Sequence, residues 1–119
     1  MERLTIGGKK FNNDEEIRQF LKDKLQVNKL TIDGKKFNNK EEIHQFLKDK
    51  FYFPDYYGMN ADALWDMMTA WIEFPLTIEW INFHESLDKM GHDAEILLEI
   101  FRDAELEPLC KGFKFVLQN

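Results

Sequence analysis

Acidic and aromatic side chains are concentrated between residues 54 and 76. This segment contains no Lys, Arg or His, and its carboxylates are Asp55, Asp62, Asp66 and Glu73. Because Asp62, Asp66 and Thr69 are spaced i, i+4, i+7, a helix places them on one face, with Trp65 at its border. Fixed carboxylates beside aromatic rings are typical of binding hot spots. The same residues also fit a solvated acidic face beside ordinary core aromatics, and their spacing does not decide between the two interpretations.

Two other arrangements could carry chemistry, but neither is complete. Asp62 and Asp66 could form a general acid–base pair, and His84, Glu85 and Asp88 have a helical spacing that could hold a metal ion. Neither group has a supporting nucleophile, a third ligand or a Gly-rich phosphate loop. A surface pair of His84 and Asp88 is the better interpretation. We therefore predict that the protein is not an enzyme and uses no metal and no cofactor.

The net charge of −6 is distributed unevenly along the chain. Residues 1–53 carry twelve Lys and Arg against nine Asp and Glu, whereas residues 54–119 carry four against thirteen. The C-terminal part therefore repels nucleic acid and attracts a basic partner, although acidic charge also serves solubility. We expect no direct binding to nucleic acid.

Composition favours a single folded domain in a reducing compartment. Apolar residues make up 44% of the chain and aromatic residues 14%, which is enough for one core. No apolar run approaches the length of a membrane span or of a secretion signal. The single cysteine, Cys110, cannot form an internal disulfide, and we expect it to be a semi-buried, unreactive thiol. We predict a cytoplasmic protein with no membrane contact.

The elements that must position the acidic segment alternate between strands and helices. A Pro- and Gly-containing loop over 54–58 precedes a helix that Asn60 caps. Periodicity and breakers predict helices over about 60–71, 82–90 and 93–106 and strands over 76–80 and 113–117. This order predicts an α/β domain with a small parallel sheet.

The N-terminal part is a tandem repeat. Residues 3–28 align without gaps to residues 29–54, with 18 of 26 positions identical. Each copy is predicted to form a short strand, a Gly-containing turn and a helix. The helix begins with a capping box in both copies: Asn13 lies three residues before Glu16, and Asn39 three before Glu42.

Only the second copy runs directly into Pro54, so we predict a domain over 29–119 and a separate duplicated unit over 1–28. The first copy could add a fourth parallel strand to the sheet, stay loosely attached, or dock on a second molecule by domain swapping. The apolar helix face of Ile17, Phe20 and Leu21 favours docking. A monomer is expected, with a swapped dimer as the alternative. In each arrangement the first copy leaves the face over 56–71 intact.

The stretch PDYYGMNADALWDMMTAWIEFPLTIEW, residues 54–80, resembles the barstar family of ribonuclease inhibitors. The similarity runs without gaps from Lys29 to about Ala104 and more loosely to the last strand. The resemblance implies a fold with three parallel strands packed by helices. It also implies an intracellular inhibitor of a small basic extracellular ribonuclease of the barnase type.

The resemblance implies which residues contact the nuclease. They are Tyr56, Gly58, Asn60, Asp62, Trp65, Asp66, Thr69, Ala70, Trp71 and Asp103. Asp66 matches the central aspartate, whose carboxylate takes the place of an RNA phosphate in the nuclease active site. Asp62 matches a second acidic contact, and Tyr56 matches the aromatic residue that packs over the catalytic histidine. Substrate mimicry is thus the implied mechanism, with carboxylates held on a rigid helix.

Three positions depart from the family pattern. Asp103 replaces the usual Glu, Ala61 replaces a Leu, and Ala70 replaces a Gly close to the contact surface. These changes predict a different cognate nuclease more than a different mechanism. The alternative function is an interaction or immunity module that kept the fold but binds another basic protein.

Overall fold

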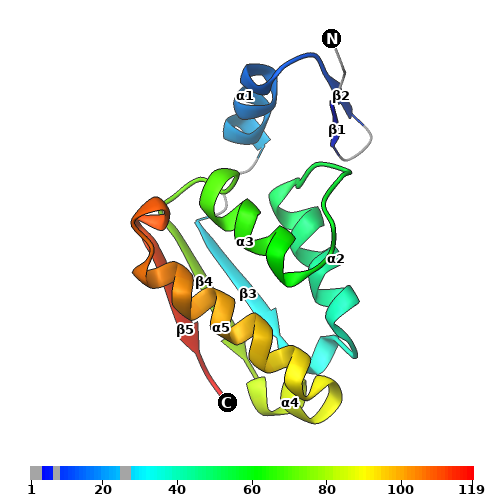
Figure 1. Cartoon of the computed structure of the whole chain (residues 1–119), viewed down its shortest axis with the longest axis vertical. Helices are drawn as coiled ribbons and strands as arrows, with labels where there is room; N and C mark the ends of the chain where they lie inside the picture. The colour runs from blue at the N-terminus through cyan, green and yellow to red at the C-terminus, as the bar shows by residue number, and fades with distance from the viewer. Residues whose placement is uncertain (1–3, 7–8, 25–27) are drawn as a thin grey trace.

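A computed structural model of the chain describes residues 4–6, 9–24 and 28–119, with side chains described for 12–19 and 28–119 (Figure 1). The strands are β1 (Leu4–Ile6), β2 (Lys9–Phe11), β3 (Lys29–Asp33), β4 (Leu76–Ile81) and β5 (Phe113–Leu117). The α-helices are α1 (Asp14–Lys24), α2 (Lys40–Phe51), α3 (Ala61–Ala70), α4 (Phe83–Met90) and α5 (His92–Leu106). Two 3₁₀ turns, η1 (Gly34–Lys36) and η2 (Pro108–Cys110), follow β3 and α5.

The central sheet has three parallel strands in the order β3-β4-β5. Burial alternates along β4, where Leu76, Ile78 and Trp80 are buried and the residues between them are only half-buried. Such alternation shows that one face of the sheet carries the core, whereas parallel sheets in larger α/β proteins are covered on both faces. The predicted α/β fold with a three-stranded parallel sheet is confirmed.

The helices bury their apolar stripes against this face and against one another. In Figure 1, α3 and α5 lie in front of the sheet and α2 lies beside β3. The core joins Ile43 and Leu47 of α2 to Leu64 of α3 and Phe101 of α5. Within the described residues, no helix combines the length and the apolar character that crossing a membrane requires.

The first repeat copy does not add a strand to the central sheet, so that option was wrong. β1 pairs antiparallel with β2 in a separate two-stranded sheet, with Leu4 opposite Phe11 and Ile6 opposite Lys9. This pairing satisfies the backbone groups of β1 locally, which removes the need for the edge of β3.

The helix of the first copy forms as predicted. α1 begins after Asn13, whose side-chain oxygen accepts the Glu16 N–H at 2.9 Å. Ile17 is only 1% exposed, which supports a docked unit. The side chains of Phe20 and Leu21, predicted to share its face, and the connection over 25–27 lie outside the described residues.

Candidate partner-binding surface

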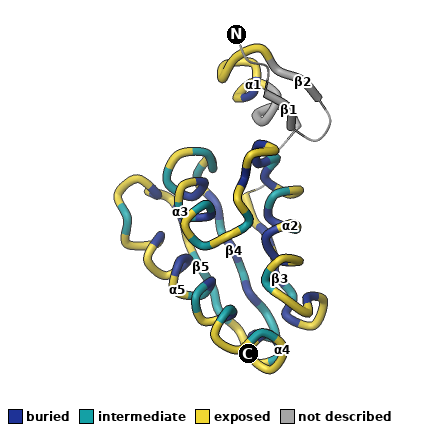
Figure 2. Tube along the Cα trace, turned by 45° about the vertical axis from the view of Figure 1, so that its right-hand side comes forward, coloured by how far each residue is buried: buried dark blue, intermediate teal, exposed yellow. Residues whose placement is uncertain are grey.

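One side of α3 is buried and the other carries the two aspartates. Leu64 and Met68 are fully buried, whereas Asp62 and Asp66 are exposed. Figure 2 shows that α3 has both buried and exposed positions. The i, i+4 spacing therefore places both carboxylates together on the solvent side of a helix whose opposite side is anchored in the core. The helix contains no basic residue. The surface can bind a cationic group of a partner.

The N-terminus of α3 is fixed by Asn60 and Gly58. The Asn60 side-chain oxygen accepts the Ala63 N–H at 2.8 Å, which is an N-cap bond. Its amide nitrogen donates to the Gly58 carbonyl oxygen at 3.3 Å. A Cβ added at Gly58 would lie 3.2 Å from the same amide nitrogen, so a larger residue would press on the cap. Both residues thus position α3 and the preceding loop.

The loop before α3 presents one tyrosine and buries the next. Tyr56 is 67% exposed, whereas Tyr57 is 5% exposed. The Tyr57 N–H donates to the Pro54 carbonyl at 2.9 Å, and its hydroxyl shares a hydrogen bond of 2.6 Å with Nδ1 of buried His44. Burial raises the pKa of Tyr57 and lowers that of His44, so both groups are held neutral. Tyr57 thereby fixes the loop that displays Tyr56.

The remaining predicted residues of α3 surround the carboxylates but use their polar atoms internally. The Thr69 hydroxyl donates to the Trp65 carbonyl at 2.9 Å. The Trp71 indole N–H donates to the Phe51 carbonyl at 3.1 Å, which holds this half-buried ring in place. Trp65 packs against the core, and Ala70 is exposed. These residues therefore offer a partner mainly surface for packing, because the Thr69 hydroxyl and the Trp71 indole are already bonded within the protein.

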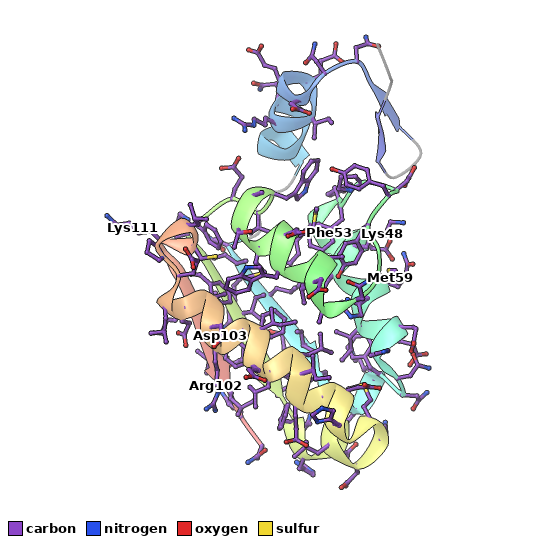
Figure 3. The ribbon with its side chains drawn as sticks, viewed as in Figure 1. Lys48, Phe53, Met59, Arg102, Asp103 and Lys111 are labelled. Carbon is purple, nitrogen blue, oxygen red and sulfur yellow. The ribbon has the colours of Figure 1, made fainter. Side chains whose placement is uncertain are left out.

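Asp103 comes from a different element. It is exposed on α5, the helix that packs against α3 (Figure 3). The fold therefore places the Asp103 carboxylate on the helix that packs against α3, although Asp103 and Asp66 are 37 positions apart in the sequence. All ten predicted contact residues lie on α3, on the loop before it and at its caps, or on α5.

The first repeat copy borders this surface without covering it, since Tyr56, Asp62 and Asp66 stay exposed. A cleft with a volume of about 270 Å³ lies between α1 and the C-terminal part of α3. Asp14, Ile17 and Arg18 line one wall, and the other wall includes Tyr56, Ala70, Trp71 and Glu73. The reason is that α1 docks at the end of α3, a placement that no local sequence pattern specifies.

The other candidate groups remain separate from this surface. His84 and Asp88 are exposed on α4. Among the residues that the structure describes, no three or more His, Cys, Asp or Glu side chains are grouped as metal ligands. Cys110 is buried, its Sγ donates to the Met68 carbonyl at 3.3 Å, and burial raises its thiol pKa. A raised pKa disfavours the nucleophilic thiolate, which fits the predicted unreactive thiol.

Sequence reasoning missed His44, a buried residue that supports the surface through its hydrogen bond to Tyr57. It lies under the Tyr56-Tyr57 loop and not on the acidic face. The sequence feature that could have indicated His44 is a difference between the repeat copies. The matching position in the first copy is Arg18. A position where one copy has histidine and the other arginine indicates two different environments.

The fold and the surface together define a small α/β domain with an anchored helix that exposes two carboxylates. The chain belongs to the Barstar (barnase inhibitor) family, whose model matches residues 27–118. It is 45% identical over 118 residues to a Bacillus subtilis (strain 168) protein named "Putative ribonuclease inhibitor YrdF". That alignment covers 99% of this chain and 100% of the relative, so it extends over the N-terminal unit. The chain is thus an inhibitor-type protein and not an enzyme.

Proposed function

We propose that this protein inhibits a small, basic, extracellular ribonuclease of the barnase type by blocking its active site. In this proposal the loop carrying Tyr56 and the exposed side of α3 enter the nuclease cleft. Asp66 takes the position of an RNA phosphate among the cationic groups of the enzyme, and Asp62 provides a second carboxylate. Asp103 adds an ion pair from α5, and Tyr56 packs on the catalytic histidine.

The observation that carries the proposal is the placement of Asp62 and Asp66 on the exposed side of a helix that is buried on its other side. A carboxylate and a phosphate oxygen accept the same charge-assisted hydrogen bonds from Arg and Lys. The residues over 54–119 carry nine more acidic than basic side chains, which would steer a basic enzyme toward this surface. The family match and the name of the relative support a ribonuclease as the partner.

Rigidity of the surface supports tight binding. The loop is held by the Tyr57–His44 hydrogen bond, and the helix N-terminus is held by the Asn60 cap. Met59, between them, has a left-handed backbone with φ of 56°, a conformation that persists only where the surroundings enforce it. Little conformational entropy is therefore lost when the partner docks.

The lone, buried thiol of Cys110 and the absence of any disulfide partner for it support a cytoplasmic site of action. There the inhibitor would protect the cell from nuclease that has not yet been exported. The shorter carboxylate of Asp103 and the methyl group of Ala70 support a cognate enzyme that differs from barnase itself.

The test is to titrate the protein into barnase-type ribonucleases and to follow RNA cleavage, first with the wild type and then with Asp66→Ala. The variant should weaken inhibition by at least ~2 kcal/mol, the usual threshold for an interface hot spot, a class for which an aspartate of barstar is itself a standard example. Asp88→Ala, which removes an exposed aspartate from α4, is the matched control and should inhibit normally.

If Asp66→Ala inhibits as well as the wild type, the proposed binding mode is wrong. If the wild type inhibits no such ribonuclease but binds another basic protein through Asp66, the alternative of a barstar-fold interaction module is correct.

A further inference from the structure

A cleft between α1 and α3 lies next to the acidic surface. Its lower wall belongs to the domain and contains two aromatic residues and a carboxylate, Tyr56, Trp71 and Glu73. Its upper wall belongs to the first repeat copy and contains a carboxylate, an apolar side chain and one cation, Asp14, Ile17 and Arg18. The cleft therefore needs both the first repeat copy and the part of the domain that follows the second copy.

The lining of the cleft suits a long cationic side chain. Asp14 and Glu73 are both exposed, so their carboxylates can pair with a guanidinium or ammonium group that enters from solvent. The rings of Tyr56 and Trp71 can pack on its methylene groups or its charge. Ile17, at 1% exposure, supplies an apolar floor. Arg18 offsets one of the two negative charges and leaves the cleft net acidic.

The cleft is continuous with the proposed nuclease-binding surface. Tyr56, Ala70 and Trp71 belong to both, so a protein that contacts these three residues reaches the edge of α1. Tyr56 stays 67% exposed beside α1, and Asp62 and Asp66 are exposed as well. The first copy therefore borders the surface without covering it, which argues against a lid.

The charge of α1 has the sign that a basic partner requires. Its first turn consists of Asp14, Glu15 and Glu16, all exposed. The second copy carries Lys40 at the position that matches Asp14. The helix next to the surface thus begins with an acidic residue where its duplicate begins with a basic one.

We propose that the cleft between α1 and α3 binds a Lys or Arg side chain of the nuclease that lies outside the nuclease active site. This inference rests on the proposed function, and it makes the first repeat copy a determinant of which ribonuclease is inhibited. Nucleases with a cationic residue at the matching place are bound more tightly than those without one.

The test uses two variants of the full chain in the inhibition assay. Asp14→Lys introduces the residue that the second copy tolerates at the first position of α2, so the helix should still form. Glu73→Gln removes the second carboxylate without changing its size. Each should raise the inhibition constant, and Asp14→Lys should raise it about fivefold or more, since it replaces an attraction by a repulsion.

Matched controls separate this local effect from the loss of net negative charge. Asp88→Lys on α4 and Glu95→Gln on α5 make the same charge changes at exposed positions; α4 lies at the end of the molecule opposite to α1 (Figure 1). They should change the inhibition constant by less than about twofold at physiological ionic strength. Thermal unfolding should show that all four variants are folded.

The outcomes distinguish this inference from the proposed function. If the wild type inhibits, Asp66→Ala does not, and Asp14→Lys and Glu73→Gln behave like their controls, the proposed function stands and the cleft inference is overturned. If Asp14→Lys or Glu73→Gln inhibits better than the wild type, α1 obstructs the surface and the inference is also overturned. If the wild type inhibits no ribonuclease, the proposed function fails first.

Discussion

The two repeat copies have nearly the same sequence but fold differently before their helices. Both contain the sequence LTI, followed by Gly-Gly or Asp-Gly and then by KKF. In the second copy LTI lies in β3, parallel to β4, and the next residues form the turn η1 with Phe37 buried in the core. In the first copy the same residues form the antiparallel pair β1–β2. Strand conformation in this repeat is therefore decided by the available partner.

The positions where the copies differ explain which copy joins the domain. Asp33, matched by Gly7 in the first copy, accepts hydrogen bonds at 2.9 Å from the Asn82 amide and at 3.0 Å from the Lys35 N–H. His44, matched by Arg18, bonds to Tyr57. Phe53, matched by Val27, packs on Tyr57 with ring centroids 4.8 Å apart. The second copy thus carries the contacts to later parts of the chain.

The largest effect on stability is expected when buried His44 is replaced by Arg, the residue at the matching position of the first copy. His44→Arg places a permanent charge in a site that is 2% exposed and breaks the hydrogen bond to Tyr57. We expect a loss of about 3 kcal/mol in the free energy of unfolding, because a buried, unpaired charge is strongly unfavourable. Urea unfolding of the variant and the wild type measures this loss.

The reciprocal exchange, Arg18→His, is the control. Arg18 is exposed on α1, so the free energy of unfolding should change by no more than about 0.5 kcal/mol. Equal losses in the two variants would mean that the copies occupy equivalent environments, which would contradict the comparison.

A pH dependence of stability should also arise in the second copy, at His44. Burial lowers the pKa of His44 below its usual value of 6.5, and the charge of Lys40 adds to the effect. Below about pH 6.5 the unfolded chain therefore binds more protons than the folded chain, so the free energy of unfolding falls as the pH falls through the folded-state pKa. Urea unfolding between about pH 8 and pH 5 tests this.

The variant His44→Gln serves as the reference for this measurement. It removes the titrating ring, so its unfolding free energy should depend less on pH in this range. Asp33 does not interfere, because hydrogen bonds from Asn82 and Lys35 lower its pKa from 3.8 and its contribution is lost only at more acidic pH. Parallel curves for the wild type and His44→Gln would show that His44 is not the group responsible.

Removing the first copy should have the smallest effect on the fold. The deletion of residues 1–26 retains Asn28, whose carbonyl accepts the Thr77 N–H at 2.9 Å and so continues the β3–β4 pairing. We expect the remaining chain to fold with a modestly lower melting temperature. Ribonuclease inhibition should persist and be weakened by a smaller factor than in Asp14→Lys, because the deletion removes the attraction of Asp14 without adding a repulsion.

Melting temperature, inhibition constant and mass in solution should be measured for the full chain and for the deletion. If the shortened chain is unfolded or does not inhibit, the first copy is part of the working fold, and the domain over 29–119 was wrongly assigned. A full chain that is dimeric where the deletion is monomeric would favour domain swapping.

Local signals in the sequence determined the helices. Asn13 and Asn39 form the same cap, with the N–H of Glu16 and Glu42 donating at 2.9 and 3.0 Å. A cap and an apolar stripe involve residues three or four positions apart, so identical sequences give identical helices in both copies. For the same reason the spacing of Asp62 and Asp66 was enough to place both carboxylates on one face of α3.

Only the tertiary structure decided how the loop before α3 is held, which strand pairs with β1 and where α1 lies. The interactions that decide these features join residues that are distant in the sequence. The Tyr57–His44 hydrogen bond spans 13 positions and the Asp33–Asn82 bond spans 49. β1 pairs with β2 and not with the edge of β3. Strand pairing depends on the neighbouring strand, so the three residues of β1 do not decide it by themselves. The placement of α1 beside Trp71 likewise follows from docking between surfaces, which no periodicity within α1 specifies.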